Sequence, residues 1–330
     1  MREIAICSDD EQLLRRSAAA RRPTRLALLA SLAALCLLPG CLTIRAVPDS
    51  VSLSAPTVEI PIERLNGVFF VDALIEGQGP YRLVLDTGAG MLTLRPEVID
   101  EIGLEARRFP WRMRGASETR WGWRRSGRVA ELTIGDQVTI RSFRYVEHDL
   151  PLSVDGLIGN GILDHCAMLV DPLQQRIWLS TEPTTPHADD VPLRLSHGVP
   201  TIEIVCGERT VRATLDSGCS GTLDLPLAQE EKIPLEPGGT AVQTYSIHGS
   251  HWLKVRRYDG VITVGPLEIP HPLVRFGSGH PLVGLPLFHG APLRIDLRTK
   301  TLQLGPSVIL PTDEPDALPH GLIPVADTPH

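Results

Sequence analysis

Short runs of apolar and β-branched residues recur along most of the chain, and each run is bounded by Gly, Pro or Asp. Runs of this length with such boundaries predict β-strands. Only two stretches favour a helical turn, 96–102 and 226–231, and each opens with a proline suited to a first helical turn. The pattern therefore predicts an all-β fold. The expected strands include 67–75, 81–85, 129–134, 167–170 and 176–179.

Composition supports this expectation and makes one class of function unfavourable. The 330 residues include 29 Gly and 29 Pro, which divide the chain into short segments. The net charge is -7, so the chain as a whole provides no positive field for a phosphate backbone. We therefore expect a polypeptide or small-molecule partner and no nucleic acid.

The first 40 residues have the pattern of a signal peptide. Arginines between 15 and 25 precede an apolar run at 26–38, which is too short to span a bilayer comfortably. The run ends in Leu-Pro-Gly-Cys, which resembles the lipobox of bacterial lipoproteins and implies a lipid anchor on Cys41. Because Leu42 follows, the resemblance also implies sorting to the outer membrane of the cell envelope, facing the periplasm. A simple cleaved signal or an uncleaved anchor is the alternative.

Three cysteines remain once the signal and Cys41 are set aside. Cys166, Cys206 and Cys219 can form at most one disulfide, and neither they nor the histidines show the spacing of a metal site. We expect buried thiols with the packing role of small apolar side chains, and no metal or other cofactor.

The rest of the chain carries one sequence pattern twice. An apolar strand followed by Asp-Thr-Gly at Asp86 matches an apolar strand followed by Asp-Ser-Gly at Asp216. In both halves a proline comes ten positions after the aspartate and a glycine 49 positions after it. Each half also has a later apolar-apolar-Gly element, ending at Gly159 and Gly284. Two copies of one fold are therefore expected.

This repeat predicts the domain organisation. The linker between the copies is rich in proline and polar residues. The expected parts are a lipoprotein-type signal peptide at 1–40, a tether at 41–57, lobe 1 at 58–182, a linker at 183–198, lobe 2 at 199–308 and a Pro-rich tail at 309–330.

The repeated motifs resemble those of the retropepsin and pepsin families of aspartic proteases, in which such a loop and an apolar-apolar-Gly element define each lobe. The resemblance covers nearly all of 58–306. It implies two homologous retropepsin-like β-barrel lobes related by a pseudo-twofold axis, with the active site between them. It also implies roles for six residues: Asp86 and Asp216 as catalytic aspartates, Thr87 and Ser217 as braces between the two loops, and Gly88 and Gly218 as turn glycines.

Elementary electrostatics agrees with these roles. Two carboxylates a few ångström apart cannot both ionise cheaply, so Asp86 and Asp216 are expected to share one proton. The ionised member then activates a water and the protonated member donates to the substrate carbonyl. We expect Gly88 and Gly218 to allow a positive φ and a close approach of the two loops.

The equal spacing in both halves leaves room for a flap hairpin in each, near 113–128 and 243–254, as in a fused retropepsin-like dimer. Trp121 and Tyr245 in these segments are candidate substrate contacts, and packing of these aromatics onto their own lobe is the alternative. A second repeated aspartate pair, Asp171 and Asp296, precedes turn-like sequences, so we expect both to cap hairpin turns.

The sequence thus predicts a membrane-tethered aspartic endopeptidase, monomeric because the short linker favours pairing of the lobes within one chain. Two alternatives stay open: a catalytically silent lipoprotein that holds a peptide in the cleft, and lobes that pair between chains. Ala89 and Cys219 follow the two catalytic turns without a hydroxyl donor. A dyad without that donor is expected to keep its proton to higher pH.

Overall fold

The computed structural model describes residues 45–65, 67–150, 153–185, 187–288 and 290–305, together with the backbone of 322–324. The signal peptide and Cys41 lie outside the described residues. Strands dominate the described part, so the expected all-β class is confirmed. Each described helix is too short or too polar to cross a membrane.

Lobe 1 is built on a nine-stranded sheet within the described residues, in the order β1-β9-β6-β10-β5-β4-β8-β7 with β3 beside β4. Its strands are β1 (Ser50–Leu53), β3 (Glu63–Leu65), β4 (Val68–Ile75), β5 (Gln78–Asp86), β6 (Leu92–Leu94), β7 (Arg107–Arg114), β8 (Thr119–Ile134), β9 (Val138–Glu147) and β10 (Gly156–Gly159). Helix α2 (Pro96–Ile102) begins at the predicted proline and ends before Gly103, whose φ of 75° suits a glycine cap.

Lobe 2 is built on an eleven-stranded sheet, again counted within the described residues. Its strands are β14 (Arg194–Ser196), β15 (Val199–Cys206), β16 (Arg209–Leu215), β17 (Leu223–Leu225), β18 (Thr240–Ser246), β19 (Gly249–Arg257), β20 (Val261–Val264), β21 (Leu267–Pro270), β22 (Leu273–Phe276), β23 (Leu282–Val283) and β26 (Leu322–Pro324). The 3-10 helices are η1 (Asn160–Asp164) in lobe 1, and η2 (Leu227–Lys232) and η3 (Leu285–Phe288) in lobe 2.

The same strand pairing occurs in both halves. In lobe 1, β10 pairs in parallel with β5 and antiparallel with β6. In lobe 2, β23 pairs in parallel with β16 and antiparallel with β17. The apolar-apolar-Gly element of each half therefore lies beside the strand that leads into its aspartate. The origin of the halves as two copies stays a prediction.

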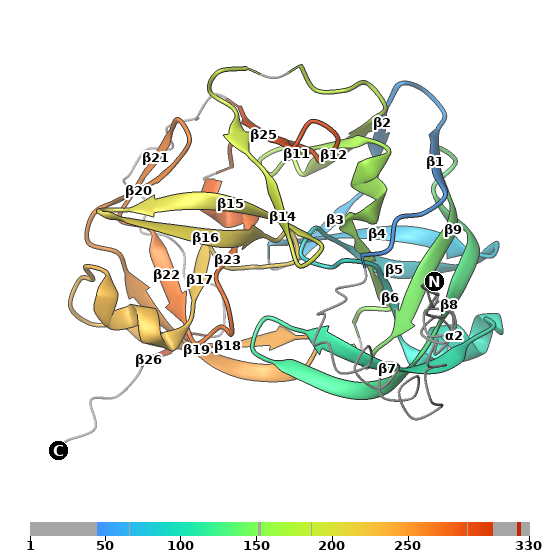
Figure 1. Cartoon of the computed structure of the whole chain (residues 1–330), viewed down its shortest axis with the longest axis horizontal. Coiled ribbons are helices and arrows are strands. Elements are labelled where there is room, and N and C mark those ends of the chain that lie inside the picture. The colour runs from blue at the N-terminus through green and yellow to red at the C-terminus, as the bar shows by residue number, and fades with distance from the viewer. Residues whose placement is uncertain are drawn as a thin grey trace, which may run out of the picture. The chain divides into compact units, whose positions relative to one another are not determined.

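A six-stranded sheet combines strands of both halves, in the order β13-β25-β24-β11-β12-β2. Its strands are β2 (Thr57–Ile60), β11 (Ala167–Asp171), β12 (Arg176–Ser180), β13 (Val191–Pro192), β24 (Leu293–Asp296) and β25 (Thr301–Leu304). In Figure 1 the strands β5 and β16 lie between this shared sheet and the long hairpins β7–β8 and β18–β19. Buried residues of both halves, from Ile60 to Leu302, form one continuous core.

Some boundaries differ from the sequence prediction. The expected tether is folded from residue 45, because β1 pairs with β9 and β2 pairs with β12. The expected linker contains β13 and β14, which pair with β25 and β15. The expected tail contributes β26, which pairs with β18. These short segments gain their hydrogen bonds from distant strands, which the local sequence does not show.

Candidate active site

Each aspartate of the repeat lies at the end of a buried strand. Asp86 is the last residue of β5, and Asp216 directly follows β16. The neighbouring strand β10 places Gly159 opposite Asp86, and β23 places Val283 opposite Leu215. The two catalytic turns therefore leave equivalent positions in the two sheets.

The glycine of each apolar-apolar-Gly element lies directly under the turn beside it. A Cβ atom on Gly159 would lie 2.5 Å from the backbone nitrogen and oxygen of Met91. A Cβ atom on Gly284 would lie 2.1 Å from the carbonyl oxygen of Gly221. Both distances are far below van der Waals contact, so a side chain at either position would displace the catalytic loop.

Thr87 and Ser217 join the two loops by reciprocal hydrogen bonds. The Ser217 backbone N–H donates to Thr87 Oγ1 (3.0 Å), and the Thr87 N–H donates to Ser217 Oγ (3.0 Å). The Thr87 hydroxyl donates to the Leu215 carbonyl (2.6 Å), and the Ser217 hydroxyl donates to the Leu85 carbonyl (2.7 Å). Both side chains are buried. The two loops are therefore held together by four hydrogen bonds.

The two carboxyl groups share a side-chain hydrogen bond. A Cβ atom on Gly88 would lie 2.7 Å from Asp216 Cγ, and one on Gly218 would lie 3.0 Å from Asp86 Cγ. The glycines are thus required for the close approach of the opposite carboxyl group. The expected positive φ is wrong, since neither glycine is among the residues with positive φ.

The pKa values of Asp86 and Asp216 are shifted differently by burial and by their closeness to each other. Burial raises the pKa of Asp86, whereas hydrogen bonds from Asp216 and from the backbone of Gly88 and Ala89 lower it. Burial also raises the pKa of Asp216, and the nearby Asp86 raises it further, so it lies well above its usual range. Although each residue keeps some surface exposure, protein atoms surround the carboxyl groups. We therefore assign the shared proton to Asp216 and the negative charge to Asp86.

A buried ion pair lies beside Asp216, and the sequence analysis did not predict it. Asp224 on β17 and Arg275 on β22 are direct partners in the register of the sheet. The guanidinium donates to both Asp224 oxygens at 2.6 Å, and the two side chains are only 4% and 11% exposed. Arg275 also donates to Cys219 Sγ (3.4 Å). The Cys219 thiol lies 3.6 Å from an Asp224 oxygen.

Asn160 is a second residue that the sequence interpretation missed. Its side chain is buried, and its amide donates to the carbonyl oxygens of Thr87 (3.1 Å), Ala89 (2.9 Å) and Gly198 (3.1 Å). It therefore holds the first catalytic loop against the β14–β15 turn of lobe 2. The sequence does contain one hint of this role: Asn160 directly follows the apolar-apolar-Gly element, whereas the apolar residue Leu285 stands at the matching position of lobe 2.

The hairpins β7–β8 and β18–β19 meet at their tips, which supports the expectation of two flaps. His248 Nε2 lies 3.2 Å from the Met113 carbonyl, and the hydroxyls of Ser117 and Ser246 are 3.4 Å apart. The tips also reach the opposite lobe: Gly279 N–H donates to the Ala116 carbonyl (2.7 Å), and Ile247 packs against an apolar cluster of lobe 1. The two hairpins thus form a continuous roof.

The proposed substrate contacts, Trp121 and Tyr245, both lie on this roof and are highly exposed, by 73% and 66%. Trp121 is the cross-strand partner of Arg112, and Tyr245 is the partner of Ser250. Neither aromatic belongs to the hydrophobic clusters of the described residues. The alternative that they pack onto their own lobe is therefore not supported, and their role in substrate binding stays a prediction.

The second aspartate pair has the expected role in turns. Asp171 accepts hydrogen bonds from the backbone N–H groups of Leu173 (3.0 Å) and Gln174 (2.9 Å). Asp296 accepts one from the Arg298 N–H (2.9 Å) and also forms an ion pair with the Arg298 side chain. Although burial opposes it, this pairing lowers the pKa of Asp296 to about 2. Both aspartates therefore stabilise turns.

The three described cysteines are free and buried, as expected. Burial raises the pKa of Cys166 to about 12 and that of Cys206 to about 11. Burial also places the pKa of Cys219 well above its usual range. A thiol with a raised pKa is a poor nucleophile and a poor metal ligand, so these residues contribute to packing.

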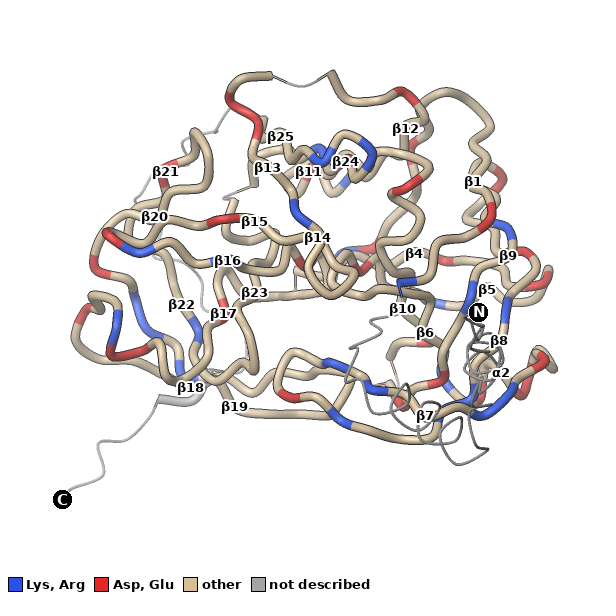
Figure 2. Tube along the Cα trace, viewed as in Figure 1, with Lys and Arg blue, Asp and Glu red and all other residues tan. Residues whose placement is uncertain are grey.

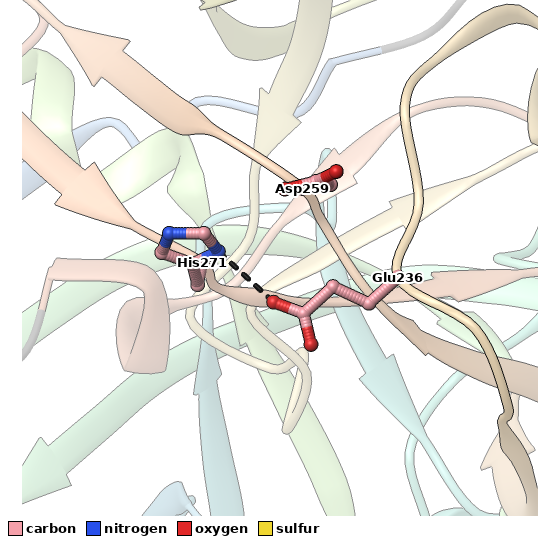
Figure 3. A group of neighbouring side chains, drawn as sticks. All are labelled: Glu236, Asp259 and His271. Atoms are coloured by element: carbon pink, nitrogen blue, oxygen red, sulfur yellow. Dashed lines mark hydrogen bonds and ion pairs between the residues drawn. The ribbon is translucent and has the colours of Figure 1, made fainter.

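One group of potential metal ligands occurs among the described residues. Glu236, Asp259 and His271 bring one ligand atom each to within 4.8 Å of one another (Figure 3). His271 Nδ1 is 3.0 Å from a Glu236 oxygen, so an ion pair accounts for this contact. Glu236 lies between η2 and β18, Asp259 between β19 and β20, and His271 between β21 and β22; Glu236 is partly exposed and the other two are exposed. We interpret the group as a surface ion pair.

The paired Asp-Thr/Ser-Gly turns, the reciprocal braces and the adjacent carboxyl groups have the arrangement expected of an aspartic protease active site. The model of the family described as "Aspartyl protease" matches residues 71–162, which include Asp86 and the first apolar-apolar-Gly element. This match agrees with the expected resemblance to retropepsin-like aspartic proteases over that part of the chain.

Among solved structures, the chain is similar to the crystal structure of a retropepsin-like aspartic protease from Rickettsia conorii. The sequence identity is 16%, and the match covers 39% of this chain and 92% of the other, with a TM-score of 0.29. This overlap is too weak to support a functional argument. No curated protein matches the sequence.

Proposed function

We propose that this protein is an aspartic endopeptidase that hydrolyses peptide bonds with a water activated by Asp86 and Asp216. The observation that carries the proposal is the close approach of the Asp86 and Asp216 carboxyl groups, each packed against the glycine of the opposite loop, where the two loops are braced together. The family match supports a protease function, and it spans residues 71–162, which include Asp86.

The two carboxyl groups divide the proton transfers. Asp86, as the carboxylate, accepts a proton from the attacking water, while Asp216 donates its proton to the carbonyl oxygen of the scissile bond. The resulting tetrahedral diol collapses when its C–N bond breaks. The amine leaves with the proton that Asp86 received, and Asp216 regains a proton from the diol hydroxyl. One water is consumed, and the dyad returns to its starting state.

Cleavage of a random peptide library tests this proposal. Wild-type protein is expected to release new amino termini inside peptides, and Asp86→Asn is expected to release none above background. A variant that still binds library peptides without cutting them supports the mechanism. Wild-type protein that binds peptides and never cleaves them would favour the alternative of a catalytically silent, peptide-binding lipoprotein.

We also place this activity at the bacterial envelope, on polypeptides near a lipid anchor at Cys41. The support is the basic and apolar leader that ends at this cysteine. Metabolic labelling with a radioactive fatty acid, followed by immunoprecipitation, is expected to label the wild type and not Cys41→Ser. Equal labelling of both proteins would rule out this anchor.

A further inference from the structure

The exposed aromatic side chains are concentrated on the roof. Within the described residues, all exposed large aromatics lie on the hairpins β7–β8 and β18–β19, while the other aromatics are at least partly buried. Exposed tryptophans are costly in water and mark interaction surfaces. The five residues are Phe109, Trp121 (73%), Trp123 (65%), Tyr245 (66%) and Trp252 (53%).

The two exposed tryptophans of the first hairpin, Trp121 and Trp123, lie on one exposed face, whereas Phe109 lies on the other face. The register pairs Pro110 with Trp123, Arg112 with Trp121 and Arg114 with Thr119. Side chains alternate along a strand, so these residues lie on the face opposite the buried Trp111. We call this surface the outer face. It consists of Arg108, Pro110, Arg112, Arg114, Thr119, Trp121 and Trp123, all of which are exposed.

The first hairpin is also the most basic part of the chain. Residues 107–128 contain eight arginines and one acid, Glu118, which gives them a charge of +7 in a chain of net charge -7. Figure 2 shows this concentration along β7 and β8. Burial lowers the pKa of Arg114, whose side chain lies against His197, and the charge of Arg112 lowers it further.

The second hairpin provides an internal contrast. Its equivalent exposed aromatics, Tyr245 and Trp252, have Ser250 and Gln243 as cross-strand partners. Lys254 and Arg256 are the cations on that face of β19, and both are paired with Glu230. Both hairpins therefore expose aromatic rings, but only the first sets them among several guanidinium groups.

We propose that the outer face of the β7–β8 hairpin docks onto a membrane surface of anionic phospholipids. Tryptophan prefers the boundary between headgroups and acyl chains, because its ring is apolar and its N–H is polar. Arginine pairs well with phosphate oxygens, and each basic residue near an anionic surface adds to binding. Since the rest of the chain is acidic, an anionic membrane attracts this face and repels the others.

The start of the folded chain lies near the same hairpin. Arg45 donates to Asn160 (2.6 Å), and Asn160 donates to Gly198 (3.1 Å). The adjacent His197 lies 3.4 Å from Arg114. Cys41 comes four positions before Arg45 in the sequence, a span of at most about 14 Å. An anchor at Cys41 would therefore hold this end of the protein near the membrane, although docking does not depend on it.

Flotation with vesicles tests the proposal in the full chain carrying Cys41→Ser, which removes any lipid. Vesicles of phosphatidylglycerol and phosphatidylcholine are expected to bind the protein, and vesicles of phosphatidylcholine alone to bind it much more weakly. The triple change Arg108→Gln/Arg112→Gln/Arg114→Gln is expected to weaken binding about 100-fold. Trp121→Ser/Trp123→Ser is also expected to weaken it, and to remove most quenching of tryptophan fluorescence by brominated lipids.

The matched control is Tyr245→Ser/Trp252→Ser, which removes aromatics from the hairpin whose cations on that face are paired with Glu230. It is expected to retain most of the binding. Thermal unfolding verifies that each variant folds. We expect all of them to fold, because the substituted side chains are exposed. Equal binding to neutral and anionic vesicles, or wild-type binding by the triple variant, would overturn the proposal. So would retention of an acidic polypeptide such as polyglutamate without retention of vesicles, since the face would then recognise acidic peptides.

Discussion

The two catalytic loops have the same backbone frame and different surroundings. In lobe 1, Thr93 on β6 lies opposite Val146 on β9. The equivalent positions in lobe 2 are Asp224 and Arg275, a buried ion pair. In both lobes the strands around the catalytic loop hold one aspartate of the dyad beside the other. Among the described residues, the strands of lobe 2 also place a third carboxylate, Asp224, near the dyad.

This difference separates geometry from electrostatics. The braces, the glycines and the strand pairing are shared by the lobes and determine where the carboxyl groups lie. The ion pair occurs in lobe 2 alone, and Asp224 is one of the groups that raise the pKa of Asp216. A symmetric frame can therefore hold a dyad in which one member keeps the proton.

The largest expected effect comes from changing either member of the dyad. Asp86→Asn and Asp216→Asn should each lower kcat/KM by roughly 10²–10⁴-fold, because each removes one partner of the proton transfers. The double variant should be little worse than either single one. Asp171→Asn is the matched control, since Asp171 caps a turn. Steady-state hydrolysis of a fluorogenic peptide measures all four, and full activity in Asp216→Asn would refute the assignment.

The second effect concerns stability. Arg275→Met leaves the Asp224 carboxylate buried without its partner and should lower the free energy of unfolding by about 3–5 kcal/mol. The double change Asp224→Thr/Arg275→Val introduces the lobe 1 residues at both positions. It should recover most of the loss, because the unpaired charge is gone. Urea denaturation measures both, and equal losses in the two proteins would mean that packing rather than charge dominates here.

A smaller effect is expected in the pH profile of the same double variant. Asp224 raises the pKa of Asp216, so its removal lowers the pH at which the dyad loses its shared proton. The alkaline limb of kcat/KM should therefore move to lower pH, while the acidic limb, which reports Asp86, should move less. An alkaline limb that stays in place would show that Asp224 does not influence proton sharing.

The smallest effect is expected from a hydroxyl beside Asp86. The Ala89 N–H already donates to an Asp86 oxygen at 3.0 Å. Ala89→Ser adds a second donor nearby and should lower the pKa of Asp86, which moves the acidic limb of kcat/KM to lower pH. Cys219→Ser is the matched change in lobe 2, where the side chain contacts Asp224 and Arg275. It should leave the acidic limb unchanged, and an upward movement in Ala89→Ser would contradict the hydrogen-bond argument.

The raised pKa values also predict the working range. Burial raises the pKa of both Asp86 and Asp216, so the state with one shared proton extends above the usual carboxyl range. Activity should therefore be centred at mildly acidic to neutral pH. A pH profile of kcat/KM with its optimum in strong acid would contradict this prediction.

Features that occur in both halves, or that depend on neighbouring residues, could be predicted from the sequence. Asp86 and Asp216 stood out because each follows an apolar strand and precedes a glycine, and the turn role of Asp171 follows from neighbouring residues. Asp224 and Arg275 could not be paired in this way, because they lie 51 positions apart and meet through the parallel register of β17 and β22.

The short strands at the start of the chain were missed for a related reason. β1 contains four residues, and its partner β9 begins at Val138. A strand of this length is stabilised by its neighbour rather than by its own sequence, so the segment was interpreted as a tether. The buried thiols, by contrast, could be predicted from the sequence alone, because the three cysteines lack the spacing of a disulfide framework or a metal site.

The shared six-stranded sheet has a consequence for synthesis and folding. Its central pairing joins β11 to β24, with Met168 opposite Ile295. When lobe 1 has left the ribosome, β11 still lacks its partner, and such an unpaired edge is a template for pairing with other chains. The late return of β24 makes the fold rich in contacts between distant residues, which slows folding. The nascent first half must therefore be protected until the last strands of the second half arrive to close the sheet.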